Sequence, residues 1–195
     1  MGKARWIAAA AAGTAAVAAA AYYLNERNSE KPEYDLLIDE GRLALRDYPA
    51  LLVAQTSQSG QRETALGNGF RVLSDYIFAR SRPGPKIAMT APVLSCPGDD
   101  QGWLTRFAMP SRWTRATLPM PSSGVEIVEI PARKLAAIRF SGTIDDAMLA
   151  EHTGELREWM AANGLDPAGP PEYAFYNSPF IPGAMRRNEV LIPVA

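Results

Sequence analysis

Short apolar runs, partly alternating with polar residues, follow one another early in the chain. They cover residues 36–38, 43–45 and 50–58, and Pro49 separates the second run from the third. Runs of this length and pattern are typical of strands that bury one face. We therefore expect three consecutive strands before the chain reaches Gly60.

The periodicity becomes helical over residues 62–79. Leu66, Phe70, Leu73 and Ile77 recur at intervals of four, three and four residues, which places them on one face of a helix. Such a stripe suits a helix packed on a sheet, and it equally suits a helix that offers apolar contact to a ligand. The spacing alone leaves both interpretations open.

Two glycines weaken the first turns of this helix. Gly67 and Gly69 each cost about 1 kcal/mol relative to alanine in a helix interior. Helix propensity does not explain them, so we expect a close approach to a neighbouring segment or to a ligand.

The segment 86–95 alternates apolar residues with small or polar ones, which predicts another strand. Pro92 interrupts this segment and cannot donate a backbone hydrogen bond. We therefore expect the strand to bulge, to bend or to lie at an edge of its sheet. A Pro-Gly-Asp-Asp turn at residues 97–100 then predicts a hairpin with residues 103–109.

The second half of the chain repeats the organisation of the first. The interval from Pro49 to Gly60 and the interval from Pro131 to Gly142 are both eleven residues long, and each begins with a Pro-Ala pair and an apolar run. A helical pattern follows each glycine, and residues 188–194 close a second hairpin. Two copies of a strand–helix–hairpin unit predict a pseudo-twofold α+β domain, in which one antiparallel sheet carries both helices.

The second predicted helix ends at Gly164. Leu149, His152, Leu156 and Trp159 share one of its faces. Because these neighbours are apolar, the pattern places His152 at least partly inside the protein.

Residues 1–24 stand apart from the rest of the sequence. Lys3 and Arg5 precede an uncharged, mostly alanine stretch over residues 6–24. This length is close to the roughly 20 residues that cross a bilayer, and the basic start also fits a signal peptide. A cleaved signal peptide and an uncleaved N-terminal membrane anchor are both open. Either predicts export, with the folded part outside the cytoplasm, periplasmic or anchored to the membrane; the alternative is a disordered alanine-rich tail.

Composition limits the remaining possibilities. The chain has 195 residues and a formal net charge of −1 at pH 7, which argues against nucleic acid as a partner. Residues 25–33 are typical of a linker, which leaves residues 34–195 for one domain with its own core. Cys96 is the only cysteine, so an internal disulfide and a cysteine cluster for zinc are excluded. Any catalytic arrangement that needs histidine depends on His152.

Several short motifs stand in a fixed order along the chain. They are Leu45-Arg46-Asp47-Tyr48-Pro49-Ala50, Lys86-Ile87-Ala88-Met89-Thr90-Ala91-Pro92-Val93, Phe107-Ala108-Met109-Pro110, Leu118-Pro119-Met120-Pro121, Phe140-Ser141-Gly142 and Arg187-Asn188-Glu189-Val190. Together they resemble the motifs of the SOUL family, also called the heme-binding protein family, over about residues 34–195. The resemblance implies an eight-stranded antiparallel distorted barrel flanked by two helices and formed by the duplicated units.

The resemblance also implies a function. A SOUL-like protein is not an enzyme, and it binds heme or a related tetrapyrrole without covalent attachment in an apolar groove beside the first helix. By position, the residues that would contact the porphyrin are Leu66, Phe70, Arg71, Leu73, Ile77 and Met89. Arg71 would reach a propionate, because a guanidinium can hold a carboxylate with two hydrogen bonds.

Two residues bear on how a porphyrin would be held. His152 is a candidate axial ligand through a neutral imidazole nitrogen, although its apolar face equally fits a histidine packed on the sheet with one hydrogen-bonded nitrogen. Asp75 and Gly67 stand where better-known SOUL members carry basic residues on the first helix. Asp75 would repel a propionate.

Other functions stay open on the same fold. The duplicated architecture also resembles the effector-binding domains of transcription regulators, and relatives of that fold include hydrolases. A hydrolase would use a buried carboxylate or phenol, for which Glu126, Glu129, Glu172 and Tyr173 are candidates. A partner-binding module at the cell envelope is a further alternative.

Overall fold

The computed structural model describes residues 28–98 and 102–195. The signal peptide or membrane anchor predicted at residues 1–24 lies outside the described residues, as does part of the turn predicted at residues 97–100. Within the described ranges, no helix combines the length and the apolar character that crossing a membrane requires.

The described chain forms one antiparallel sheet with two α-helices. The strands are β1 (Asp35–Glu40), β2 (Leu43–Tyr48), β3 (Leu51–Gln58), β4 (Val93–Pro97), β5 (Trp103–Ala108), β6 (Glu126–Ile130), β7 (Arg133–Phe140), β8 (Glu172–Phe175) and β9 (Asn188–Pro193), and the helices are α2 (Arg62–Ile77), α3 (Asp146–Ala162) and the short 3₁₀-helix η2 (Gly183–Met185). The strand order across the sheet is β1-β2-β7-β9-β8-β4-β5-β3-β6. The predicted α+β class is confirmed.

The sheet differs in detail from the eight-stranded distorted barrel that the resemblance implies. It has nine strands in the described residues, and its edges β1 and β6 do not pair, so it is not closed. The additional strand is β1, which pairs only with β2. Gly41 has a left-handed backbone with φ +74°, which permits the tight turn that joins these two strands.

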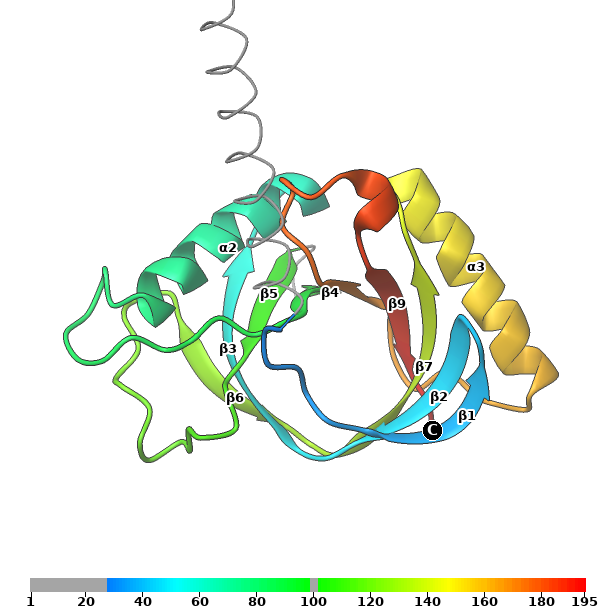
Figure 1. The fold of residues 1–195 in the computed structure, drawn as a ribbon, viewed down its shortest axis with the longest axis horizontal. Coiled ribbons are helices and arrows are strands. Elements are labelled where there is room, and N and C mark those ends of the chain that lie inside the picture. The colour runs from blue at the N-terminus through cyan, green and yellow to red at the C-terminus, as the bar shows by residue number, and fades with distance from the viewer. Residues whose placement is uncertain (1–27, 99–101) are drawn as a thin grey trace, which may run out of the picture.

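The predicted duplication is confirmed by the strand order. β4 and β8 pair at the centre, β5 and β9 flank them, and β3 and β7 follow on either side. One unit is therefore β3-α2-β4-β5 and the other is β7-α3-β8-β9, with the same sequence of elements. Figure 1 shows the two helices in equivalent positions on either side of the central strands.

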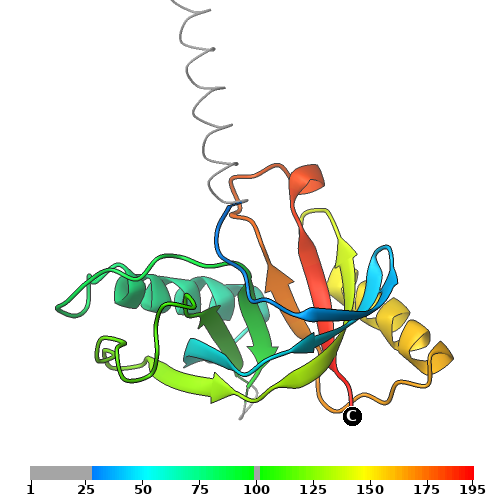
Figure 2. The same ribbon diagram turned by 60° about the horizontal axis from the view of Figure 1, so that its bottom comes forward.

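The two Pro-Ala pairs mark the point where the units cross. β2 pairs with β7 and β3 pairs with β6, so the strand that precedes each unit joins the other unit. Tyr48 lies opposite Arg133, and beyond the interruption Leu51 lies opposite Ile130 in the same register. The ladder stops between these pairs, where the prolines have no N–H to donate. Figure 2 shows β6 continuing into β7 through this crossing.

Each helix packs on two strands of its own unit. α2 contacts β3 and β5, and α3 contacts β7 and β9. Leu149, Leu156 and Trp159 of α3 belong to one core cluster, whereas Leu73 and Ile77 of α2 belong to another. The central pair β4–β8 therefore lies between the helices, as Figure 1 shows.

Gly69 lets α2 approach the sheet. A Cβ atom at this position would lie 2.2 Å from Oγ1 of Thr105 and 3.3 Å from Cγ2 of Thr56. Real Cβ atoms do not approach other heavy atoms so closely, so the crossing of α2 over β5 needs a glycine. The position of a Cβ at Gly67 is open. The expected close approach is thus found at Gly69 and not at Gly67.

The strand predicted over residues 86–95 is only partly found, although the backbone bends at Ala91, directly before Pro92. Residues 86–92 are not a strand, and β4 begins only at Val93, in the centre of the sheet between β8 and β5. Because Pro92 precedes the strand, its missing N–H costs no ladder bond. The preceding segment is held by other bonds: the N–H of Ile87 donates to the carbonyl of Ile77 at 2.7 Å, and Oγ1 of Thr90 donates to the carbonyl of Ala108 at 2.7 Å.

Candidate functional sites

A strip of apolar side chains crosses the face of the sheet that carries the helices. Phe70 on α2 contacts Phe107 on β5, with ring centroids 5.4 Å apart. Phe107 pairs with Val93 on β4, which in turn pairs with Phe175 on β8. Partners in an antiparallel register point to the same face, so these side chains line up across the centre. We call Leu66, Phe70, Val93 and Phe175 the outer strip.

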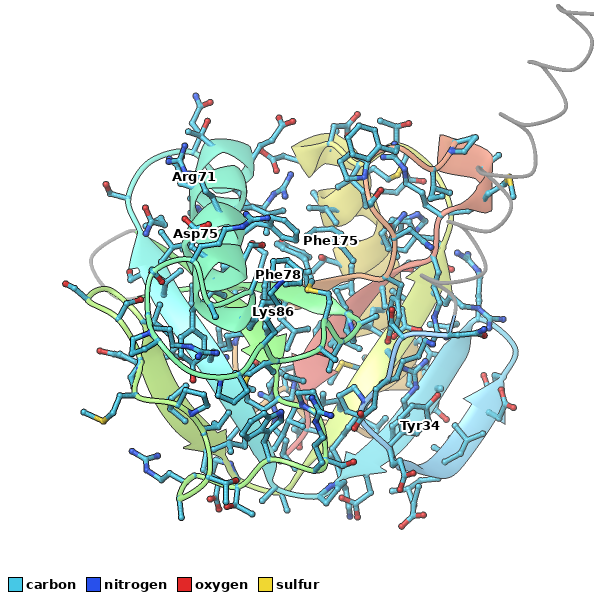
Figure 3. All side chains as sticks on the ribbon, turned by 60° about the vertical axis from the view of Figure 1, so that its left-hand side comes forward. Tyr34, Arg71, Asp75, Phe78, Lys86 and Phe175 are labelled. Carbon is cyan, nitrogen blue, oxygen red and sulfur yellow. The ribbon has the colours of Figure 1, made fainter. Side chains whose placement is uncertain are left out.

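The outer strip is most exposed at its α2 end. Phe70 is 43% exposed, and Leu66, one helical turn earlier, is half-buried. Val93 and Phe175 are also half-buried, and Figure 3 shows Phe175 between the two helices. Contiguous apolar surface on a soluble protein often marks contact with an apolar ligand or a partner.

The structure divides the predicted stripe of α2 into two parts. Leu66 and Phe70 reach the surface, whereas Leu73 and Ile77 are 0% and 1% exposed in the core cluster under α2. Met89 is half-buried and packs against the same cluster. A ligand on this face can therefore touch the first half of the stripe, while the second half supports it from below.

Arg71 and Asp75 lie along one side of α2 (Figure 3). Arg71, the predicted propionate partner, is exposed, and its Nη2 donates to Oδ1 of Asn68 at 3.2 Å. Oδ1 of Asp75 accepts from Nη1 of Arg80 at 3.4 Å, so a neighbouring cation offsets its charge. Figure 3 shows Arg71 and Asp75 one above the other on α2.

His152 lies on the other helix and away from the outer strip. Its ring stacks on Phe140, with centroids 4.0 Å apart, and its side chain is 15% exposed. Nδ1 lies 3.5 Å from Oε2 of Glu155 and makes no hydrogen bond within the described residues. The histidine is thus packed on the sheet without the hydrogen bond expected for one ring nitrogen. No group of three or more His, Cys, Asp or Glu in the described ranges could hold a metal ion.

A cleft opens on the opposite face of the sheet, and we call it the inner cleft. It encloses about 710 Å³, including the part open to solvent. Pro49 and Pro131 both line it, so it lies on the pseudo-twofold axis. Leu94, Leu135 and Leu191 form part of its walls and belong to a core cluster separate from the two beneath the helices.

Two ion-pair clusters underlie the inner cleft. Glu189 is 0% exposed and accepts hydrogen bonds from Nη1 and Nη2 of Arg46, at 2.7 and 3.1 Å, and from Nη2 of Arg187 at 2.7 Å. Glu172 accepts from both terminal nitrogens of Arg133 at 2.7 Å. Arg133 and Arg187 line the cleft, and the two carboxylates stand behind them. Each guanidinium is therefore fixed in place from below.

Burial and these ion pairs set the protonation of the cleft. Burial alone would raise the pKa of Glu189, but the hydrogen bonds and charges of Arg46 and Arg187 lower it below its usual value. Burial raises the pKa of Tyr176 well above its usual value, and the Tyr176 hydroxyl donates to Oε2 of Glu189 at 2.9 Å. Burial also raises the pKa of Tyr48. At neutral pH the cleft therefore contains guanidinium ions and protonated phenols.

The structure does not gather the predicted hydrolase residues into one site. Glu126 and Glu129 are exposed on the edge strand β6. Glu172 belongs to the inner face, whereas Tyr173 packs on the helix-covered face and stacks on Trp103 with centroids 6.2 Å apart. These four side chains therefore do not form a catalytic arrangement together.

Sequence reasoning missed the inner cleft and its charged core. The available signal was Glu189, a carboxylate among the apolar residues of β9. A charge in a buried strand requires a partner, so this residue indicated a buried ion pair. Glu189 finds that partner in Arg46, which lies 143 residues earlier on β2. Tyr176 directly follows β8 and joins the same cluster.

Comparisons with known proteins agree with this architecture. The family model described as SOUL heme-binding protein matches residues 29–193. The crystal structure of a hydrolase from Listeria innocua is similar at a TM-score of 0.58 and 11% identity, over 82% of this chain and 94% of that one. The C-terminal domain of EcmrR is similar at a TM-score of 0.60 and 16% identity, over 83% and 98% of the two chains. At these identities the likeness shows the fold. No curated protein sequence matches this chain.

Proposed function

We propose that this chain, which belongs to the SOUL heme-binding protein family, binds heme or a related tetrapyrrole without covalent attachment and without catalysis. The outer strip is the observation that carries the proposal. It offers apolar surface over the central strands, between two helices. A porphyrin is flat and largely apolar, so covering a few hundred Å² would contribute several kcal/mol at roughly 25 cal/mol per Å².

The residues of this site have different roles in the proposal. Phe70 is held against Phe107 and presents its exposed part to the porphyrin. Leu66 extends this contact along α2, and Arg71 pairs with a propionate. Leu73 and Ile77 keep α2 on the sheet rather than touch the ligand, and Met89 borders the site from the segment before β4.

The proposal does not require iron ligation by histidine. His152 stacks on Phe140 beneath α3, while the outer strip begins on α2. Apolar contact would then supply most of the binding energy, and micromolar affinity corresponds to about −8 kcal/mol.

Hemin titration of the purified full-length protein tests the proposal. We expect the Soret band of hemin to shift and to saturate at one porphyrin per chain. Protoporphyrin IX, which lacks iron, should compete with hemin at similar affinity, because the proposed contacts are made to the ring and its propionates. Absence of a saturable Soret change would contradict tetrapyrrole binding.

The inner cleft supports a second function, the binding of a small molecule. Its guanidiniums are fixed by buried carboxylates, and its walls are apolar. It favours binding over hydrolysis, since a general acid or base needs a pKa near the working pH. The pKa of Glu189 is moved away from neutrality, and its oxygens accept bonds from Arg46, Arg187 and Tyr176.

Export of the protein remains a proposal that rests on residues 1–24. Lys3 and Arg5 followed by an uncharged stretch motivate it. Alkaline phosphatase becomes active only after translocation, so a fusion of residues 1–33 to this enzyme reports on export. An active fusion is expected, and an inactive fusion retained in the cytosol would contradict the proposal.

A further inference from the structure

We infer that the inner cleft binds an amphipathic organic carboxylate, whose anionic head pairs with Arg133 and Arg187 while its apolar body lies against the prolines and leucines of the cleft. The inference names the ligand class for the second candidate function, on which it rests. It does not depend on tetrapyrrole binding, because the outer strip lies on the opposite face of the sheet.

The charges of the cleft select an anion. Lys31, Arg133 and Arg187 are among its lining residues, and no described lining residue carries a carboxylate. The Arg187 side chain is 34% exposed and that of Arg133 is 24% exposed, whereas Glu189 and Glu172 are 0% and 7% exposed. An incoming ligand therefore meets guanidinium groups, and the carboxylates that balance them are out of reach.

Each cluster also keeps an excess of positive charge. Glu189 is shared between Arg46 and Arg187. Glu172 is paired with Arg133 and lies 3.9 Å from Nη1 of Arg106. Two guanidiniums around one carboxylate leave a net charge of one positive unit in each cluster, and guanidinium groups bind carboxylates with paired hydrogen bonds.

The cluster around Glu189 is short of hydrogen-bond acceptors. Nε of Arg46 is buried and has no acceptor in the part of the chain that the structure describes. A buried arginine N–H without an acceptor indicates that the single carboxylate cannot accept hydrogen bonds from all the donors of two guanidinium groups. Arg187 is the member of this cluster that lines the cleft, so a ligand carboxylate reaches the cluster through it.

The cleft is partly open to solvent. Its volume of about 710 Å³ includes the open part, so a ligand bound there would keep one side in contact with water. The segment before β1 forms one wall through Pro32 and Tyr34. This segment is fixed at Glu30, whose carbonyl accepts from the N–H of Ala91 at 2.9 Å and whose Oε1 accepts from the N–H of Ser111 at 2.6 Å. Figure 2 shows it passing along the sheet into β1.

A fluorescent fatty acid tests the inference directly. Addition of cis-parinarate to the full-length protein should give a saturable rise in fluorescence. Dodecanoate should displace the probe, whereas dodecyltrimethylammonium, which has the same chain length and the opposite charge, should displace it at least tenfold less well. Equal displacement by the two detergents, or no saturable binding, overturns the inference.

Two variants locate the binding event. Arg187→Gln should weaken parinarate binding at least tenfold. The double variant Arg187→Gln/Glu189→Gln removes one charge of each sign, so it tests the loss of Arg187 at the wild-type net charge of the cluster. Leu51→Trp fills the cleft from β3 without changing a charge and should also weaken binding. Circular dichroism establishes that each variant is folded. Retention of full affinity in all three variants overturns the inference.

The comparison with hemin separates this inference from the proposed porphyrin site, since hemin itself carries two carboxylates. Phe70→Asp should weaken hemin binding about 30-fold and leave parinarate binding unchanged. Arg187→Gln should have the reverse effect. If both variants lose both ligands, the two ligands share one site and the inference is overturned. If the wild-type protein binds hemin but not parinarate, the inference is overturned and the hemin proposal stands.

Discussion

The two faces of the central strands β4 and β8 offer different kinds of surface. The outer strip presents apolar side chains such as Phe70, which packs on Phe107, and Phe175, which lies opposite Val93. The inner cleft presents Arg133 and Arg187, which are supported by buried carboxylates. One face can recognise a ligand by apolar area, and the other can recognise it by charge.

This difference determines how each face responds to change. Apolar contact is roughly additive in area, so an outer-strip residue can be altered without disturbing its neighbours. A buried ion pair behaves otherwise, because removal of one partner leaves the other charged and desolvated. The inner cleft is therefore coupled to the stability of the fold, whereas changes in the outer strip should act mainly on the affinity for the proposed porphyrin.

The largest expected effect is on stability when the inner cluster is broken. Glu189→Ala leaves Arg46 and Arg187 without their shared carboxylate in a buried position. We expect the free energy of unfolding to fall by about 3–5 kcal/mol. Urea denaturation followed by circular dichroism measures this difference.

The matched change on the other face is Phe70→Ala. Phe70 is 43% exposed, so truncation should cost only about 1–2 kcal/mol. Equal losses for Glu189→Ala and Phe70→Ala would contradict the proposed contrast between the two faces.

The next effect concerns hemin affinity at the outer strip. Phe70→Asp places a carboxylate where the porphyrin should lie, and its desolvation should cost about 2 kcal/mol or more, which raises the Kd about 30-fold. His152→Ala should leave the Kd within about twofold, because His152 stacks on Phe140 under α3. Soret titration of both variants measures the two Kd values. Loss of hemin binding in His152→Ala with normal binding in Phe70→Asp would place the porphyrin at α3 and contradict the proposed site at α2.

A smaller effect tests the seat of α2 on the sheet. Gly69→Ala would bring a Cβ within 2.2 Å of Oγ1 of Thr105, so we expect a loss of about 1–2 kcal/mol in unfolding free energy. Gly67→Ala has open space and should stabilise the helix by up to about 1 kcal/mol. The melting temperature should therefore fall in Gly69→Ala and rise in Gly67→Ala. A shift in the same direction in both variants would show that the packing of α2 on β5 does not require a glycine at position 69.

Much of the fold could be predicted from the sequence because its repeats are local. The intervals that begin at Pro49 and Pro131 revealed the duplication, and both prolines lie at the crossing of the two units. The place of β4 could not be predicted in the same way. Pro92 indicated a bend or an edge, but a strand that starts one residue later can occupy the centre of the sheet.

The candidate sites were predictable to unequal degrees. The spacing of the α2 stripe treats Leu66, Phe70, Leu73 and Ile77 alike, because a period on one helix does not say which end the sheet covers. The structure leaves Leu66 and Phe70 at the surface and buries the other two. The pair Arg46–Glu189 depends on two strands that the sequence separates by 143 residues. Such a contact follows from sheet order and not from any local period.

The smallest expected effect is the dependence of stability on acid pH. The folded pKa of Glu189 is lowered, because the hydrogen bonds and charges of Arg46 and Arg187 outweigh burial. A carboxyl group of this kind contributes stability above its unfolded pKa of about 4.5, and the contribution is lost as the pH falls through the folded value. Unfolding free energies measured between pH 7 and pH 3 should therefore decline more for wild type than for Glu189→Gln, which cannot titrate. Glu129→Gln removes an exposed carboxylate on β6 and should follow the wild-type curve. If the Glu189→Gln and wild-type curves fall in parallel, the ion pair under the inner cleft does not bias the fold toward the ionised carboxylate, and the inner face would differ from the outer strip in geometry alone.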